Sequence, residues 1–247
     1  MKLIEEHKLR DSHHIFKDRR DAGRYLAREL TAYKETDSIL LAIPSGGVPV
    51  TFEISKALRI PMEVIVVRKL QIPFNPEAGF GAMGPDGDLI LNEGLMAHLN
   101  LTEEEVETQA KKTLEVIRRR EQLFRGGRPL PPLNKKTVIL VDDGLASGYT
   151  MRAAVRKVRK MLPEEVVVAV PTGAWRTVDL MLPEVDVLVC LNVRTGPSFA
   201  VADAYEHWYD LNDKEVLSLL SSNHSNNSGS FPKCCKRWHG KPPSKPL

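Results

Sequence analysis

The chain has 247 residues, of which 42% are hydrophobic and 27% charged, enough apolar material for the core of one large globular domain. No apolar run approaches the roughly 18–20 residues that span a bilayer, and the N-terminal residues lack the apolar segment of a secretory signal. Three cysteines cannot form a disulfide framework, which favours a reducing, cytoplasmic location.

The net charge of +3 is due to the C-terminal tail, residues 221–247, which carries five basic residues and no acid. Without the tail the net charge is −2, so bulk charge does not indicate nucleic-acid binding. The tail is rich in Ser and Asn and then in Lys and Pro, and we expect it to be disordered. Its Cys234, Cys235 and His239 fit no zinc-binding spacing. We therefore predict one domain over residues 1–220, followed by a basic tail.

The first quarter of the chain predicts a β-loop-α-β unit. Helical spacing of apolar residues alternates with short runs that are apolar throughout, and the latter are typical of buried strands. The predicted elements are the helix Arg19–Tyr33, the strand Ser38–Ile43, the helix Val48–Leu58 and the strand Met62–Val67.

The next segment is irregular. Prolines and glycines interrupt Arg68–Gly87, which predicts a long irregular loop, with room for a short strand, of the kind that often covers a binding site. Asp88–Leu91 has the composition of a short strand. Thr102 and Glu105 form a capping box, and the helix that they start is expected to end near Phe124. We interpret its basic run, Arg118–Arg120, as solvated charge at a helix C-terminus; a phosphate or RNA contact is the alternative.

The second half of the chain alternates all-apolar strands with helices. The predicted elements are the strand Thr137–Val141, the helix Thr150–Met161, the strand Val166–Val170, the helix Ala174–Met181 and the strand Val185–Cys190. Strands that are apolar throughout and alternate with helices indicate a parallel sheet covered on both faces. We therefore predict an α/β fold of three layers.

The segment Val138–Thr150, VILVDDGLASGYT, is the most informative part of the sequence. A buried strand brings Asp142 and Asp143 to its carboxyl end, where ligands bind in open α/β sheets. The glycines and hydroxyls that follow lead into a helix N-terminus, which presents backbone N–H groups to an anion. Carboxylates suit sugar hydroxyls or a divalent ion, so acids beside an anion site indicate a ribose 5-phosphate.

Other phosphate-binding loops fit less well. The sequence contains no Gly-Lys-Ser/Thr of the NTPase loop and no G-x-G-x-x-G after the first strand. An aspartyl-phosphate phosphatase would need an acid two residues after Asp142, and that residue is Gly144. An ordinary turn between strand and helix would not explain two adjacent acids.

Val138–Thr150 closely resembles the phosphoribosyl pyrophosphate-binding motif of type I phosphoribosyltransferases, and residues 10–220 as a whole most resemble the uncharacterised predicted phosphoribosyltransferases of bacteria and archaea. The resemblance implies a parallel-sheet, three-layer fold with a small hood and a flexible active-site loop. It implies that Asp142 and Asp143 bind the ribose hydroxyls, with an indirect part in holding a metal. The 5′-phosphate would be held by Gly144, Leu145, Ala146, Ser147, Gly148, Tyr149 and Thr150.

Further site residues follow from the same resemblance. Pyrophosphate would be bound by Ser45, Gly46 and Gly47 and by Arg68 and Lys69. The two cations would also act catalytically, with Glu77 of the covering loop Phe74–Met83. Phe199 and Tyr205 would form the hood over the base. Ser45 departs from the group, in which arginine is expected, and this places pyrophosphate affinity in question.

The resemblance implies transfer of a phosphoribosyl group from 5-phosphoribosyl 1-pyrophosphate, with Mg²⁺, to a nitrogen nucleophile such as a nucleobase, in nucleotide metabolism. We expect small-molecule substrates, a homodimer, and neither nucleic-acid nor membrane partners. A non-catalytic sensor of nucleotides or of the pyrophosphate ester is the alternative. An RNA-binding protein that uses Arg118–Arg128 and the tail is the third interpretation.

Overall fold

The central sheet of this protein has six parallel strands in the order β1-β9-β8-β7-β2-β3. The computed structural model describes residues 1–226, apart from the side chains of Pro76, Glu77 and residues 223–226. The strands are β1 (Lys2–Ile4), β2 (Ser38–Ala42), β3 (Met62–Val64), β7 (Thr137–Val141), β8 (Glu165–Ala174) and β9 (Val187–Arg194).

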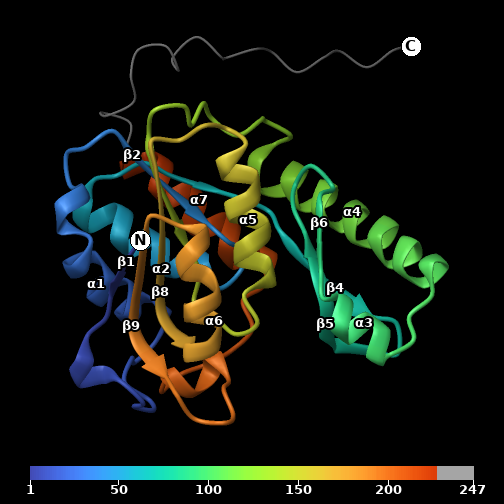
Figure 1. The fold of residues 1–247 in the computed structure, drawn as a ribbon. Coiled ribbons are helices and arrows are strands. Elements are labelled where there is room, and N and C mark those ends of the chain that lie inside the picture. The colour runs from blue at the N-terminus through green and yellow to red at the C-terminus, as the bar shows by residue number, and fades with distance from the viewer. Residues whose placement is uncertain (227–247) are drawn as a thin grey trace, which may run out of the picture.

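Helices cover both faces of this sheet (Figure 1). On one face lie α1 (Arg19–Glu29) and α2 (Gly47–Leu58), with α7 (Asp213–Asn226) packed on α2; on the other lie α5 (Tyr149–Arg159) and α6 (Trp175–Met181). Alternate residues of each strand enter opposite cores: Leu40 packs on the α1/α2 side and Leu41 on the α5/α6 side. The predicted three-layer α/β fold is therefore confirmed, because strands apolar on both faces must be covered twice.

Two features of the sheet were not predicted. Strand β1 pairs with β9 at the sheet edge, and its three residues are too few to show a period. Strand β8 continues to Ala174 rather than ending at Val170, because it stays in register with β9 as far as Arg194.

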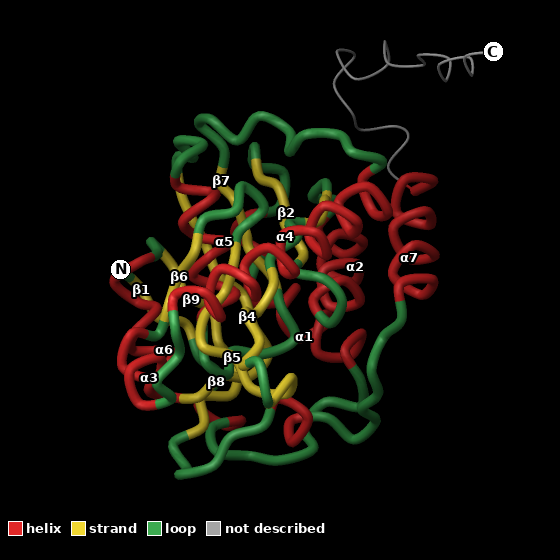
Figure 2. The backbone as a smooth tube through the Cα atoms, turned by 90° about the vertical axis from the view of Figure 1, so that its right-hand side faces the viewer, coloured by secondary structure: helices red, strands yellow, loops and turns green. Residues whose placement is uncertain are grey.

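The region predicted as a long irregular loop forms a second sheet instead. Strands β4 (Arg68–Ile72), β5 (Asn75–Met83) and β6 (Leu89–Leu91) pair antiparallel. The glycines that suggested a loop allow close strand pairing: a Cβ at Gly81 would lie 2.3 Å from the carbonyl oxygen of Ile90. With α3 (Glu93–His98) and α4 (Glu103–Arg125) this sheet forms an arm that projects from the main body in Figure 1 and points towards the viewer in Figure 2.

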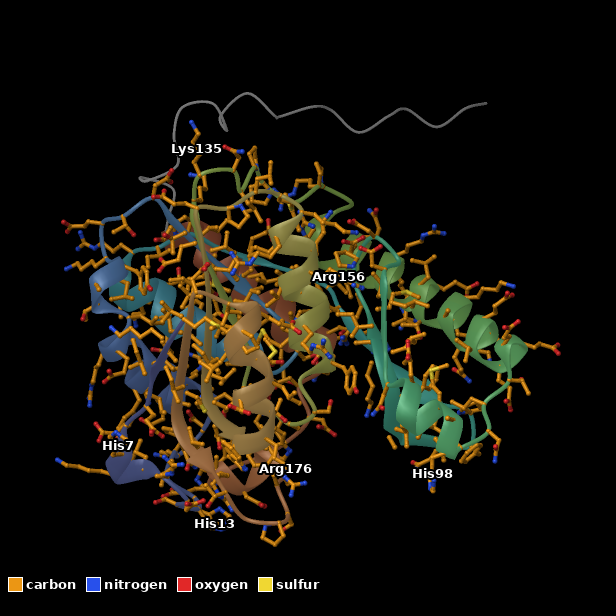
Figure 3. The ribbon with its side chains drawn as sticks, viewed as in Figure 1. His7, His13, His98, Lys135, Arg156 and Arg176 are labelled. Atoms are coloured by element: carbon orange, nitrogen blue, oxygen red, sulfur yellow. The ribbon has the colours of Figure 1, made fainter. Side chains whose placement is uncertain are left out.

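The arm is joined to the body at two places. The C-terminal half of α4 enters the core through Ile117 and Phe124. Basic residues of α5 bind the arm: Arg156 donates to the carbonyl of Leu89, and Lys157 pairs with Asp86. Figure 3 shows Arg156 on the side of α5 that faces the arm. The arm is therefore fixed to the helix that follows Val138–Thr150.

The predicted helix starts are confirmed. The side chain of Asp18 accepts a hydrogen bond from the N–H of Asp21, and Thr102 and Glu105 form both bonds of a capping box. At the other end of the chain, α7 passes the expected domain limit at residue 220 and ends at Asn226. The rest of the tail, with Cys234, Cys235 and His239, lies outside the described residues.

Among residues 1–226, no helix is long and apolar enough to cross a bilayer. The same residues contain no group of three His, Cys, Asp or Glu side chains arranged to hold a metal. Figure 3 shows His98 at the end of the arm, far from His7 and His13 on the body. His98 thus shares no site with His7 or His13.

Candidate active site

The candidate site lies at the carboxyl ends of β2 and β7, in the middle of the sheet. From β2 the chain continues to β3 on one side, and from β7 it continues to β8 on the other, so this is the switch point at which open α/β sheets bind ligands. A cavity of about 310 Å³ opens here. It is lined by Ile43, Pro44, Ser45, Gly46, Val67, Arg68, Lys69, Gln71, Arg120, Asp142, Asp143 and Thr150.

Asp142 has surroundings that disfavour its ionised form. Burial, and then the neighbouring carboxylate of Asp143, raise the pKa of Asp142 well above its usual range. Its Oδ1 accepts one backbone hydrogen bond, from the N–H of Asp143 at 2.8 Å. A ligand that brings hydroxyl donors or a cation to this carboxylate would relieve both penalties.

Asp143 is held from several sides. Its Oδ2 accepts a hydrogen bond of 2.7 Å from Nε of Arg19, and both side chains are largely buried. Arg19 also stacks on Trp208, with 3.8 Å from the guanidinium carbon to the ring centre, and donates to the carbonyl of Tyr209. Sequence reasoning missed Arg19, which had appeared only as the first residue of a helix.

Tyr205 does not reach the cavity. Its side chain is 1% exposed, and its hydroxyl donates to the backbone carbonyl of Asp143 at 2.6 Å. A ring so deeply buried cannot stack on a base, which corrects its assignment to the hood. Tyr205 instead holds the backbone of Asp143 through this hydrogen bond. Phe199 is half-buried on the loop after β9 and stays a hood candidate.

Two glycines of the loop Ser45–Gly47, which follows β2, allow this loop to lie close to Asp143 and to the end of β7. A Cβ at Gly46 would lie 1.8 Å from Oδ2 of Asp143, and a Cβ at Gly47 would lie 2.5 Å from the carbonyl oxygen of Val141. A side chain at position 46 would therefore displace the Asp143 carboxylate, and one at position 47 would displace the end of β7.

The loop Gly144–Thr150 is anchored through Leu145. The Leu145 N–H donates to the backbone carbonyl of Thr172 at 2.8 Å, and the Leu145 carbonyl accepts from the N–H of Ala174 at 3.0 Å. Its side chain is buried, so Leu145 holds the loop on β8 and has no N–H to offer a phosphate. Ala146 and Ser147 are exposed, and Thr150 lines the cavity.

Gly148 gives a direct test of this loop. It has a φ of +79°, and a Cβ there would lie 2.7 Å from the Thr177 methyl group. Gly148→Val should therefore reduce affinity for ribose 5-phosphate more than Ser147→Ala or Thr150→Ala, each of which removes one neutral hydrogen bond of about 0.5–1.5 kcal/mol. Calorimetry on the three variants measures the order, and the reverse order would indicate a site made of side chains.

Three cations border the cavity on the side of the arm: Arg68, Lys69 and Arg120. Burial, and then the charges of Arg120 and Arg119, lower the pKa of Arg68. Arg68 and Lys69 follow the second predicted strand, as expected, but they begin β4 rather than a loop. Glu77 lies in β5, but its side chain is outside the described part of the chain, and its role stays a prediction.

Arg120 corrects the interpretation of its basic run as solvated charge. Its Nη2 donates to Oγ of Ser45 at 2.9 Å and to Oδ1 of Asp213 at 2.8 Å, whereas Arg118 is exposed. The sequence did contain a signal, since Arg120 lies three residues after Ile117 and four before Phe124, on the buried face of α4.

The RNA-binding interpretation is weakened by the same residues. Arg125 is 2% exposed and faces Glu63, at 3.7 Å from Nε to the carboxylate. Arg120 and Arg125 therefore both turn inward, and Arg118–Arg128 does not form a continuous basic face.

Comparisons with known proteins agree with this geometry. The model of the phosphoribosyl transferase domain family matches residues 12–194. Two Mycobacterium tuberculosis proteins, provisionally named phosphoribosyl transferases, are each 39% identical over 210 residues, 85% of this chain. The chain spans about half the length of these relatives, 47%.

A solved structure shows a similar arrangement. The crystal structure of TT1426 from Thermus thermophilus is 33% identical, with a TM-score of 0.67 over 84% of this chain and 98% of that one. The family match covers most of the chain and includes both halves of the cavity, from Ser45 to Thr150. The chain belongs to the phosphoribosyl transferase domain family.

Proposed function

We propose that this protein binds 5-phosphoribosyl 1-pyrophosphate and transfers its phosphoribosyl group to a nitrogen nucleophile, most simply a nucleobase. One observation carries the proposal. A single cavity is lined by two half-buried acids, by Thr150 at the N-terminus of α5, and by cations that come from the arm. Those are the complements of a ribose, a 5′-phosphate and a pyrophosphate, respectively.

Each group has a defined task in this reaction. Asp142 accepts hydrogen bonds from the ribose hydroxyls, and the first N–H groups of α5, with Ser147 and Thr150, hold the 5′-phosphate. Arg68 and Lys69 bind the pyrophosphate. The bond from C1 of the ribose to the pyrophosphate oxygen breaks, and its electron pair leaves with the pyrophosphate. The acceptor nitrogen then bonds to C1 and releases its proton to solvent. Cations beside the leaving group favour the step because they stabilise the negative charge that develops on the pyrophosphate.

Mg²⁺ fits the donors present. Two adjacent carboxylates are available, whereas no third acid completes a cage among the described residues. Mg²⁺ commonly binds one or two carboxylates together with substrate oxygens and water. Asp142 and Asp143 would hold it with the substrate, and the ion would neutralise charge on the leaving pyrophosphate.

The β4–β5 hairpin is the candidate cover of the site. Its turn carries Phe74, which is 68% exposed, and its first residues, Arg68 and Lys69, line the cavity. Closure of this hairpin would exclude water, which otherwise competes with the acceptor for C1.

We also propose a homodimer, a cytoplasmic location and a place in nucleotide metabolism.

The test is release of pyrophosphate. Protein, Mg²⁺ and phosphoribosyl pyrophosphate are incubated with each of a panel of nucleobases, and pyrophosphate and the nucleotide product are both measured. Equal amounts of the two support transfer. Tight binding without release favours the sensor alternative, to which the neutral Ser45 points. Absence of binding would contradict both.

A further inference from the structure

Arg120 comes to the site from an unexpected element. Helix α4 belongs to the arm, and Arg120 lies 75 positions beyond Ser45 in the chain. Its side chain is only 16% exposed, and its guanidinium carbon is 5.4 Å from the Phe124 ring centre. Packing against the core face of α4 thus directs this cation to the loop Ser45–Gly47.

The loop itself contributes no charge. Ser45, Gly46 and Gly47 offer backbone groups and one hydroxyl, and that hydroxyl already accepts a hydrogen bond from Arg120. A pyrophosphate group carries several negative charges and is best held by a planar guanidinium that can form two hydrogen bonds at once. Arg120 therefore supplies a positive charge beside the loop Ser45–Gly47, which has no charged side chain of its own.

The cations on this side repel one another. Burial lowers the pKa of Arg68 most, the charges of Arg120 and then Arg119 lower it further, and the charge of Asp213 opposes them. Asp213 begins α7 and pairs with Arg120 at 2.8 Å. With its side chain 37% exposed, Asp213 can be replaced by an incoming anion at low cost.

We propose that Arg120 is a pyrophosphate-binding residue of this site, and that Asp213 competes with the pyrophosphate for it. The inference rests on the proposed function and deepens it. It assigns the charge for the leaving group to α4 of the arm rather than to the loop after β2, so that binding of the pyrophosphate ties the arm to the body.

The experiment compares Arg120→Gln with Arg118→Gln, an equal loss of charge at an exposed position of the same helix. Calorimetry measures binding of inorganic pyrophosphate with Mg²⁺, of phosphoribosyl pyrophosphate, and of ribose 5-phosphate. Arg120→Gln should weaken the first two by about tenfold or more, as expected for a lost charged hydrogen bond, and leave ribose 5-phosphate unchanged. Arg118→Gln should leave all three affinities unchanged.

Asp213→Asn separates binding from structure. It breaks the same ion pair but keeps the cation, so affinity for pyrophosphate should rise, whereas Arg120→Gln lowers it. If Arg120 served only to hold α4 on α7, both variants would lower the melting temperature and the affinity together. Arg120→Lys, which keeps the charge without the planar donors, should fall between wild type and Arg120→Gln.

Two outcomes would overturn the inference: equal pyrophosphate affinities for wild type and Arg120→Gln, or no pyrophosphate binding by the wild type. Failure of the proposed function looks different. Wild-type protein that binds pyrophosphate through Arg120 but forms no nucleotide with any base would refute transfer and leave the role of Arg120 intact.

Discussion

Asp142→Asn is expected to weaken binding of phosphoribosyl pyrophosphate while raising the melting temperature. The variant lacks the carboxylate that we propose accepts charged hydrogen bonds from the ribose, and each such bond contributes about 1.5–3 kcal/mol. In the empty protein, however, the amide removes a buried charge next to Asp143, and its oxygen can still accept the bond from the Asp143 N–H. The variant should therefore gain stability as it loses function.

The pH dependence of stability checks the same claim. Because the folded protein raises the pKa of Asp142 above its unfolded value, the folded state binds the proton more tightly. Stability from this group is present below the unfolded pKa and is lost as pH rises through the folded pKa. The excess melting temperature of Asp142→Asn over wild type should thus be small in acid and grow towards neutral pH.

Asp179→Asn, an exposed acid on α6, is the matched control and should change neither quantity. Calorimetry and thermal melts over a pH series supply both measurements. Unchanged affinity in Asp142→Asn would refute its assignment to the ribose. A melting temperature that fell at neutral pH would show that the carboxylate stabilises the empty fold.

Arg19→Met should have the largest effect on stability. Arg19 is buried with Asp143 and Trp208, and its loss leaves the Asp143 carboxylate without its ion-pair partner. Breaking a buried pair from one side costs about 3–5 kcal/mol. Binding should fail as well, since Asp143 would no longer be held at the edge of the cavity. Chemical denaturation at neutral pH measures the loss.

Arg24→Met provides the comparison. Arg24 pairs with Asp21 on the same helix but is half exposed, and such pairs contribute at most about 1 kcal/mol. Adding Asp143→Asn to Arg19→Met removes the unpaired charge and should restore much of the stability but none of the binding. If Arg19→Met were as stable as Arg24→Met, the ion pair between Arg19 and Asp143 would not contribute to the stability of the site.

The local features of the chain were readable from sequence because each depends on neighbours in sequence. The all-apolar strands, such as Thr137–Val141, predicted a parallel sheet covered twice, and the capping box at Thr102 predicted where α4 begins. Asp142 and Asp143 directly follow a buried strand, and that alone was enough to place them at the sheet edge where ligands bind.

Tertiary structure decided what surrounds those acids. Arg19 is separated from Asp143 by 124 positions, and Arg120 from Ser45 by 75. The antiparallel pairing of β4 and β5 likewise replaced an expected loop. The physical reason is common to all three: hydrophobic periodicity and turn chemistry act over a few residues, whereas a partner for a buried charge or an unpaired strand is chosen by packing. The sequence by itself determined the covered sheet, the acids at its edge and the candidate cations Arg68 and Lys69; only the folded chain brought Arg19 and Arg120 to them.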